Sequence, residues 1–387
     1  MIDRIRQIDN WWRSFSIENK KISERFEKSD NFDIVSFMRE NLESIHPSLM
    51  WEYGPAINCV GHRLVITPEN RMDLRPLVNE IIKRAPDIRG WEFYSYRLKE
   101  DLKRVKTMVK ARTGSDLAEL CFSGEVNRFN KIDLFFIVLN DANKEMHAKI
   151  HHQAFVAVES IVGEETLNKW IGAIEYGAAS QIDKTYYPIS KLSVWVDNQI
   201  QTIKRNLPDK PFFKRHDDRK GAIYKIEPQK KSEYPKQMDL FVGKTICQPL
   251  WENAHNGELF CSERFSRFGE IFCYVKIDGR GDLSEECFKD KSEIEDALDH
   301  ALISVELGCC IGGGTGLHYS YIDLALTDME KGFGIVKDVL CKGKITKRAW
   351  ILFFDSELES KWIGIWDDSP PPPLPDYENE EKGKTYG

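Results

Sequence analysis

Apolar side chains recur at every third or fourth position in several parts of the chain, and this spacing predicts amphipathic helices. The clearest stretch begins at Lys291, where Ser292 and Glu295 have the spacing of a capping box. Gly308 stands where a left-handed C-terminal cap is expected. The helix predicted between them has a single apolar stripe, made of Ile294, Ala297, Leu298, Ala301, Leu302 and Val305.

The same spacing, together with polar caps and terminating Pro or Gly residues, predicts further helices. They are expected at residues 1–29, from Asn31 to Pro47, at 72–85, 98–112, 145–162 and 189–203, and from Asp328 to Gly343. Short runs of branched and aromatic residues predict strands at 50–53, 57–66, 91–96, 117–122, 132–139, 170–176, 239–242, 258–261, 270–277, 317–326, 349–354 and 362–366. This mixture indicates an α+β protein with mixed or antiparallel sheets covered by helices.

A segment rich in proline and basic residues interrupts the periodic pattern at residues 204–237. It contains four prolines and carries eleven Lys or Arg against five Asp or Glu. Such a composition is typical of a connection between domains. We therefore expect N-terminal helices at 1–45, a first α+β domain at 46–203, a linker at 204–237, a second α+β domain at 238–368 and a Pro-rich, acidic, disordered tail at 369–387.

A run of glycines separates the helix that begins at Lys291 from the strand at 317–326. A phosphate-binding loop requires the order strand, glycines, helix, because the anion sits at the helix N-terminus. Here the order is helix, glycines, strand, so we expect a turn with several residues at positive φ. Glycine still permits close backbone approach of a ligand. The candidate binding residues are therefore Gly312, Gly313, Gly314, Thr315, Gly316, Tyr319, Tyr321 and Asp323.

Other combinations of reactive residues give no catalytic or metal motif. His147 and His151 lie four residues apart on a predicted helix, but Ala148 stands where a metalloprotease has its catalytic Glu. The nine cysteines include no Cys-x-x-Cys pair, which structural zinc sites use. The sequence also lacks a Gly-x-Ser-x-Gly motif. We expect no catalytic residue, no metal site and no cofactor.

Composition and charge place the chain among soluble globular proteins. The 387 residues carry a net charge of -7, which gives no general case for nucleic-acid binding. No run approaches the about 18 to 20 apolar residues of a membrane span, and the N-terminus has no apolar signal region. We expect a cytoplasmic protein with reduced thiols.

Two stretches resemble uncharacterised bacterial proteins of unknown function. The first resemblance covers about 35 residues and runs from His62-Arg63-Leu64-Val65-Ile66-Thr67 to Gly90-Trp91-Glu92-Phe93. The second combines the glycine run with Tyr319-Ser320-Tyr321-Ile322-Asp323. The order of strands and helices is similar to that of ferredoxin-like regulators, including the protein inhibitor of ribonuclease E. These resemblances imply a bacterial origin and a fold, not an activity.

Three functional hypotheses follow. We favour a non-enzymatic regulatory or immunity-like protein whose sheet edges and aromatic surface bind another protein. The second hypothesis is a small-molecule binder or hydrolase with its site at Gly312–Gly316 between the domains; alternation places His318 on the strand face opposite Tyr319, Tyr321 and Asp323, which weakens a catalytic version. The third is an RNA-associated factor that uses the basic segment 204–237. No membrane contact is expected, and the sequence leaves the oligomeric state open.

Overall fold

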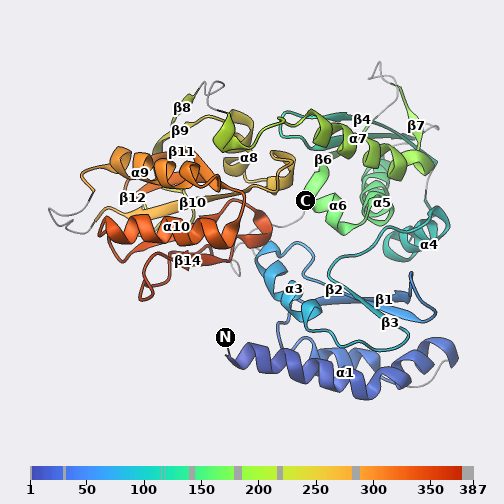
Figure 1. Ribbon diagram of the computed structural model, residues 1–387. Coiled ribbons are helices and arrows are strands. Elements are labelled where there is room, and N and C mark those ends of the chain that lie inside the picture. Colours follow the sequence, from blue (N-terminus) through green and yellow to red (C-terminus); the bar gives the residue numbers. More distant parts are fainter. Residues whose placement is uncertain are drawn as a thin grey trace. The chain divides into compact units, whose positions relative to one another are not determined.

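The structure is a computed structural model, and it describes residues 2–28, 32–114, 116–117, 119–138, 144–177, 185–215, 221–280 and 288–376 (Figure 1). The helices are α1 Ile2–Lys28, α2 Ile34–Asn41, α3 Arg75–Lys83, α4 Leu102–Thr113, α5 Lys144–Val162, α6 Glu164–Trp170, α7 Leu192–Asn206, α8 Gln248–His255, α9 Lys291–Ser304 and α10 Met329–Lys342. The strands are β1 Met50–Pro55, β2 His62–Thr67, β3 Trp91–Tyr94, β4 Leu120–Val126, β5 Ile132–Val138, β6 Ile171–Tyr176, β7 Tyr187–Pro188, β8 Ala222–Lys225, β9 Leu240–Thr245, β10 Ile271–Asp278, β11 Gly308–Gly316, β12 Tyr319–Leu326, β13 Ala349–Phe353 and β14 Trp362–Gly364. The predicted α+β class is confirmed.

The chain divides into two compact units whose boundaries alternate along the sequence. The first unit comprises residues 1–122, 136–168 and 176–193, and the second comprises 123–135, 169–175 and 194–387. The strands form a three-stranded sheet of order β1-β2-β3, a four-stranded sheet of order β6-β5-β4-β7 and a seven-stranded sheet of order β14-β13-β10-β12-β11-β9-β8.

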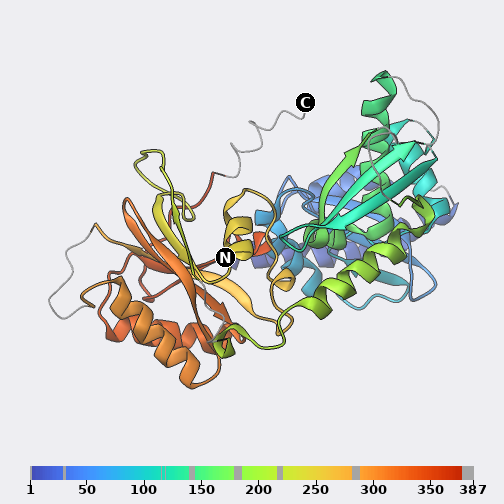
Figure 2. The same ribbon diagram turned by 90° about the horizontal axis from the view of Figure 1, so that it is seen from above.

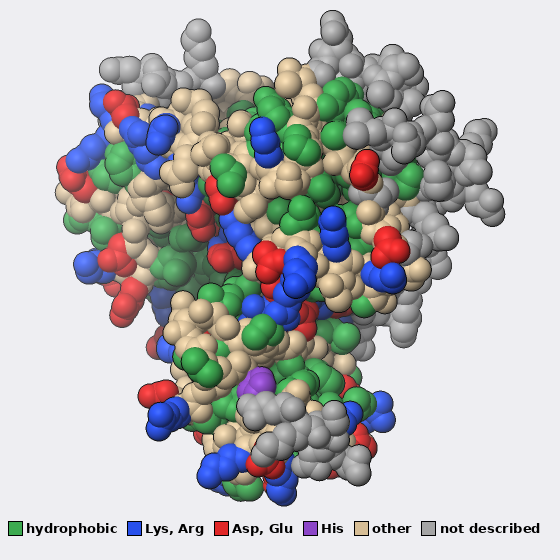
Figure 3. Space-filling model, turned by 90° about the vertical axis from the view of Figure 1, so that its right-hand side faces the viewer, with side chains coloured by type: hydrophobic (Ala, Val, Ile, Leu, Met, Phe, Trp, Pro, Cys, Tyr) green, Lys and Arg blue, Asp and Glu red, His purple; other side chains and the backbone are tan. Residues whose placement is uncertain are grey.

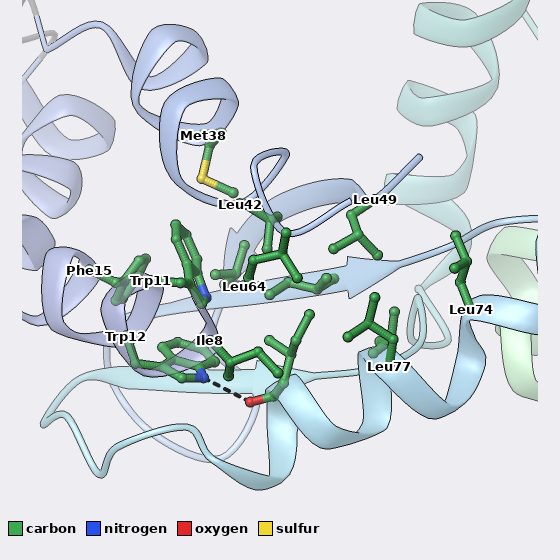
Figure 4. Packing of buried hydrophobic residues seen from close by; sticks show 14 of the residues in the cluster. Ile8, Trp11, Trp12, Phe15, Met38, Leu42, Leu49, Leu64, Leu74 and Leu77 are labelled. Carbon is green, nitrogen blue, oxygen red and sulfur yellow. Dashed lines mark hydrogen bonds between the residues drawn. The ribbon is translucent and has the colours of Figure 1, made fainter. Parts of the chain in front are cut away.

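The first unit buries one face of its three-stranded sheet under α1, α2 and α3. The apolar positions of α1 recur at helical spacing, so Ile8, Trp11 and Phe15 lie on one side of the helix and are almost fully buried. Trp12 on the same helix donates its indole N–H to the Ile81 carbonyl oxygen of α3 at 2.8 Å (Figure 4). This bond satisfies the one polar atom that the buried Trp12 ring carries into the core.

The first unit also holds a buried ionic group around Glu164. Its carboxylate accepts hydrogen bonds from Arg75 Nη2 and from the Arg97 backbone N–H, both at 2.9 Å, and from the Thr67 hydroxyl. Arg75 is fully buried, and its guanidinium lies 4.0 Å from the centroid of the Tyr96 ring. The pair therefore ties α6 to α3 and β2, because each charge depends on the other for its compensation.

The seven-stranded sheet of the second unit contains a ferredoxin-like arrangement. The chain runs β10-α9-β11-β12-α10-β13, and the corresponding strands have the spatial order β13-β10-β12-β11 with antiparallel neighbours. Both helices, α9 and α10, lie on the same face of the sheet (Figures 1 and 2). Their Leu298 and Val336 side chains belong to one buried cluster with the apolar side chains of β10 and β12. The opposite face, on which α8 packs through Leu250, carries the residues discussed below.

Several local predictions need correction. Helix α9 is capped by Asp290, which accepts from the Glu293 N–H at 3.0 Å, and not by Ser292. Gly308 is the first residue of β11 and not a helix cap, and Glu306 (φ 57°) adopts the left-handed conformation instead. Residues 258–261 form no strand, and α6 and α8 were not predicted.

The segment 204–237, expected as a linker, is partly regular structure. It includes the end of α7 and all of β8, which pairs with β9 in the seven-stranded sheet. Asn31, the cap expected for α2, lies outside the described residues; the cap in the structure is Asp33. Of the expected tail, residues 377–387 lie outside the described residues as well.

The buried pair between Arg75 and Glu164 generates a stability prediction. Replacement Glu164→Ala leaves the fully buried Arg75 without its carboxylate and should lower the free energy of unfolding by about 3–5 kcal/mol. Chemical denaturation followed by tryptophan fluorescence measures the change. The matched control is Glu80→Ala, because Glu80 pairs with Arg84 on the exposed surface of α3 and should affect stability far less. Equal effects of the two variants would contradict this assignment.

Candidate functional site

The glycine run is a strand and not the turn that we predicted. Residues 312–316 belong to β11, which pairs with β9 on one side and with β12 on the other. Of these five residues only Gly313 has a positive φ, at 142°. The prediction was wrong because glycines carry no side chain that reports a strand, and the two neighbouring strands impose the extended conformation.

The glycines of β11 are required by side chains that lie directly over the strand. A Cβ atom at Gly316 would collide with the carboxylate of Asp239, and one at Gly314 would collide with the Leu240 side chain. The space above the strand is thus filled by residues of the chain itself. The glycine run permits close packing inside the protein.

Asp239, at the start of β9, organises the connection between β11 and β12. Its carboxylate accepts from the backbone N–H groups of His318 at 2.7 Å and Tyr319 at 3.0 Å, and from the Tyr321 hydroxyl. Its backbone carbonyl accepts from the Leu317 N–H at 3.0 Å. Asp239 is completely buried, and these donors compensate the charge that burial leaves without water.

Lys276 lies beside Asp239 in the middle of β10 and is also completely buried. Its Nζ lies 4.0 Å from the centroid of the Tyr319 ring and donates to the carbonyl oxygens of Lys236, at 3.0 Å, and Tyr234. Burial lowers the pKa of Lys276 to about 7, although the nearby Asp239 opposes this shift. Lys276 therefore fastens residues 233–238, a segment we call the strap, to the sheet.

A second buried polar chain runs from Asp323 through the strap to α8. Gln237 donates to Asp323 Oδ1 at 2.8 Å, and its own amide oxygen lies 2.8 Å from His255 Nε2. His255 Nδ1 in turn lies 2.7 Å from the carbonyl oxygen of Trp251. Burial raises the pKa of Asp323 to about 7 and lowers that of His255. Burial thus opposes the charged form of both side chains, and Gln237 lies between them.

Charged side chains at the margin of this layer form a balanced group. The Tyr319 hydroxyl donates to Glu233 at 2.7 Å and accepts from Arg280 at 2.9 Å. Burial alone would raise the pKa of Asp278, yet hydrogen bonds from Arg280 and Arg348 hold that pKa well below its usual range. Two arginines thus face two carboxylates, and the group has no excess charge with which to hold an ionic ligand.

The structure brings three of the predicted residues together on the sheet face opposite α9 and α10. Tyr319 and Tyr321 are buried in one aromatic cluster, and Asp323 follows them on the same side of β12. Our argument that His318 lies on the opposite face was wrong, because β12 begins at Tyr319 and the His318 ring packs at 5.3 Å from that of Tyr234.

Sequence reasoning missed four residues of this layer: Asp239, Lys276, Gln237 and His255. One of them left a signal. Lys276 is the only cation in the otherwise apolar run of β10, and it predicts either a partner or a break in the strand. The sequence around Lys276 does not indicate that Asp239 lies near it, because Asp239 is in a different part of the chain.

Among the described residues, β8 is one of the two edge strands of the seven-stranded sheet, and β14 is the other. Ile226 donates its N–H to the Phe241 carbonyl at 2.9 Å, so this register places the Tyr224 and Ala222 backbone groups toward β9 as well. The N–H and C=O groups of Ile223 and Lys225 therefore point away from the sheet.

Strand β8 lies at an edge of the sheet, and the Tyr224 side chain anchors it to α8. The Tyr224 ring stacks on Trp251 with 4.1 Å between ring centroids, and its hydroxyl donates to Glu252 at 2.8 Å. Around this anchor several apolar side chains are exposed to solvent. They are Ile223 (74% exposed), Met238 (50%), Phe241 (39%) and Ile226 (37%).

The exposed aromatic side chains of the described residues are phenylalanines: Phe26, Phe155, Phe241 and Phe268. Each of the ten Trp residues and every Tyr that the structure describes is buried or half-buried. The face in Figure 3 shows basic and acidic side chains interspersed, with hydrophobic side chains scattered among them. On that face neither charge forms an extended patch.

The histidines that could have suggested a metal site do not form one in the described residues. His151 and His152 are exposed on α5, and the side chain of His147 lies outside what the structure describes. Throughout the described parts of the chain, no three His, Cys, Asp or Glu side chains are grouped as metal ligands. None of the helices described has both the length and the apolar character needed to cross a bilayer.

No protein-family model, curated protein or solved structure matches this chain. The resemblances to uncharacterised bacterial proteins and to the ribonuclease E inhibitor therefore stay predictions.

Two buried carboxylates of this layer should respond oppositely to neutralisation. The pKa of Asp323 is raised from 3.8 to about 7, so its stabilising contribution is complete below pH 3.8 and is lost as the pH rises through 7. Asp323→Asn should therefore match the wild type near pH 4 and exceed its free energy of unfolding at pH 8 by about 1–3 kcal/mol.

The matched variant is Asp239→Asn, which leaves part of the donor set around Asp239 unpaired. It should lower the free energy of unfolding at pH 8 by about 2–4 kcal/mol. Urea denaturation of the three proteins at pH 4 to 8 measures both effects. A destabilised Asp323→Asn protein at pH 8 would show that the Asp323 carboxylate is instead a stabilising charge.

Proposed function

We propose that this chain is a non-enzymatic regulatory protein that binds another protein by adding a strand of the partner to the free edge of β8. The observation that carries the proposal is the outward direction of the Ile223 and Lys225 backbone groups on a firmly held edge strand. Such an edge is a template for an extended peptide, because main-chain hydrogen bonds supply affinity. A regulatory or immunity-like role in a bacterial cytoplasm fits this mode of binding.

The buried polar layer supports a scaffold role and not catalysis. A catalytic acid, base or nucleophile must reach its substrate, whereas Lys276, Asp239 and Asp323 are at most 2% exposed. Their hydrogen bonds are made to the strap and to the connection between β11 and β12. The layer thus holds the start of β9 in position, and β8 is positioned by its pairing with β9.

A small-molecule site at Gly312–Gly316 has less support. Leu240 and Asp239 occupy the space that the absent side chains of Gly314 and Gly316 leave open. A ligand would have to displace both of these buried side chains, including a carboxylate with three donors. We therefore rank strand addition above this alternative.

A proline at position 223 tests the proposal. Ile223→Pro removes one outward N–H but no hydrogen bond to β9, so the fold should persist while partner binding is lost. The matched control Ile223→Thr keeps the N–H and should retain binding. Tagged wild-type and variant proteins, isolated from the cells of origin, are compared by native mass spectrometry, with far-UV circular dichroism as the test of folding.

The expected result is a protein adduct on the wild type and on Ile223→Thr that is absent from a folded Ile223→Pro. An adduct of equal abundance on all three would overturn strand addition at β8. A counterpart, Tyr224→Pro, removes an N–H that faces β9 and should destabilise the sheet, which verifies the register independently.

A further inference from the structure

We infer that the strand that pairs with β8 is an extended segment of a partner protein in which acidic and apolar residues alternate; this rests on the proposed function. Alternate residues of a strand project to opposite faces of a sheet. The two faces at the β8 edge differ in chemistry, and a pairing strand must match both.

One face at this edge carries two lysines, Lys225 and Lys244, beside the exposed Ile223. Lys225 is exposed and projects to the same face of the sheet as Ile223. Their cross-strand neighbours on β9 are Val242 for Lys225 and Lys244 for Ile223. Lys244 binds Glu295 at 2.6 Å, yet half of its side chain stays exposed (53%). Lys225 has no carboxylate within ion-pair distance among the described residues. A carboxylate on the neighbouring strand would therefore find a free cation directly across the pairing.

The other face at this edge is apolar. Tyr224 projects to this side, where it covers Trp251. Ile226 and Phe241, joined beyond it by a backbone hydrogen bond of 2.9 Å, are both partly exposed. Apolar residues of an added strand would bury these side chains further, and that burial is favourable. An alternation of acidic and apolar residues satisfies both faces at once.

The basic residues around β8 divide into paired and free ones. Lys204, Lys214, Arg215 and Lys236 each have a carboxylate partner, in Glu263, Glu306, Glu270 and Glu359. Lys225, Lys230 and Lys231 are exposed without such a partner in the described chain. Between residues 221 and 232 the only acidic residue is Glu227. Arg205 and Lys210 are also exposed without a carboxylate partner in the described chain, so three of the five unpaired basic residues lie in β8 or within six residues after it.

This distribution favours an acidic protein segment over two other occupants. A second copy of the chain would place its own lysines against these lysines, and like charges across a strand pair are destabilising. RNA would match the lysines but cannot add a strand to outward N–H and C=O groups. Its binding would depend on charge alone.

Synthetic peptides and an RNA test the inference on the full-length protein. The probes are a fluorescein-labelled ten-residue peptide of alternating Glu and Val, matched peptides with Gln or Lys in place of Glu, and a single-stranded RNA of ten nucleotides. Fluorescence anisotropy is measured for wild type, Ile223→Pro, Ile223→Thr and Lys225→Glu. We expect the Glu peptide to bind at least about 10-fold more tightly than the Gln peptide, with the Lys peptide weakest.

The variants separate the two claims. Binding of the Glu peptide should be lost in Ile223→Pro, retained in Ile223→Thr and weakened about 10-fold in Lys225→Glu. Equal affinity for the Glu, Gln and Lys peptides, with Ile223→Pro still defective, would overturn the acidic partner and leave strand addition intact. Tight RNA binding that Ile223→Pro retains, or no binding of the Glu peptide at about 1 mM, would overturn the inference.

Discussion

The burial of a lysine and an aspartate on the sheet face opposite α9 and α10 constrains the whole second unit. Lys276 and Asp239 are removed from water at a cost of several kcal/mol per ion. The cost is tolerated because backbone groups surround them: the strap gives two carbonyl oxygens to Lys276, and the connection between β11 and β12 gives two N–H groups to Asp239. Neither charge can be buried unless these segments are in place. The two buried charges therefore require the strap and the connection between β11 and β12 to take the positions seen in the structure.

The same constraint explains the most conspicuous feature of the sequence. The glycines of β11 attract a functional interpretation, because such runs often cradle phosphates. In the structure they make room for Asp239 and Leu240, and they bring β9 close to β11. Strand β9 then offers its other edge to β8, and the free edge of β8 is what we propose the protein uses. The glycine run would thus serve function by positioning a surface, without itself contacting a ligand.

Much of the fold could be predicted from the sequence where the signal is local. The cap Asp328, the alternation in β12 and the hairpin of β13 and β14 were read correctly. The errors occur where the decisive partner is remote. Four of the last five residues of β11 are glycines without side chains that would report a strand, and β8 is a strand of four residues within a basic segment. The groups that face Lys276 lie about 40 residues earlier in the chain: the carbonyl oxygens of Tyr234 and Lys236, and Asp239 just before β9. Local periodicity contains none of this information.

The most direct test of the account is residue-resolved amide hydrogen exchange across β8 and β9 in the free protein. An open edge on a rigid sheet predicts fast exchange at Ile223 and Lys225 beside slow exchange at Tyr224 and Gly243. The two fast amides should become protected when a partner strand is bound. Uniform fast exchange along β8 would show that the edge is not a rigid template, and uniform protection in the free protein would show that the edge is already occupied. Either result would contradict strand addition at β8.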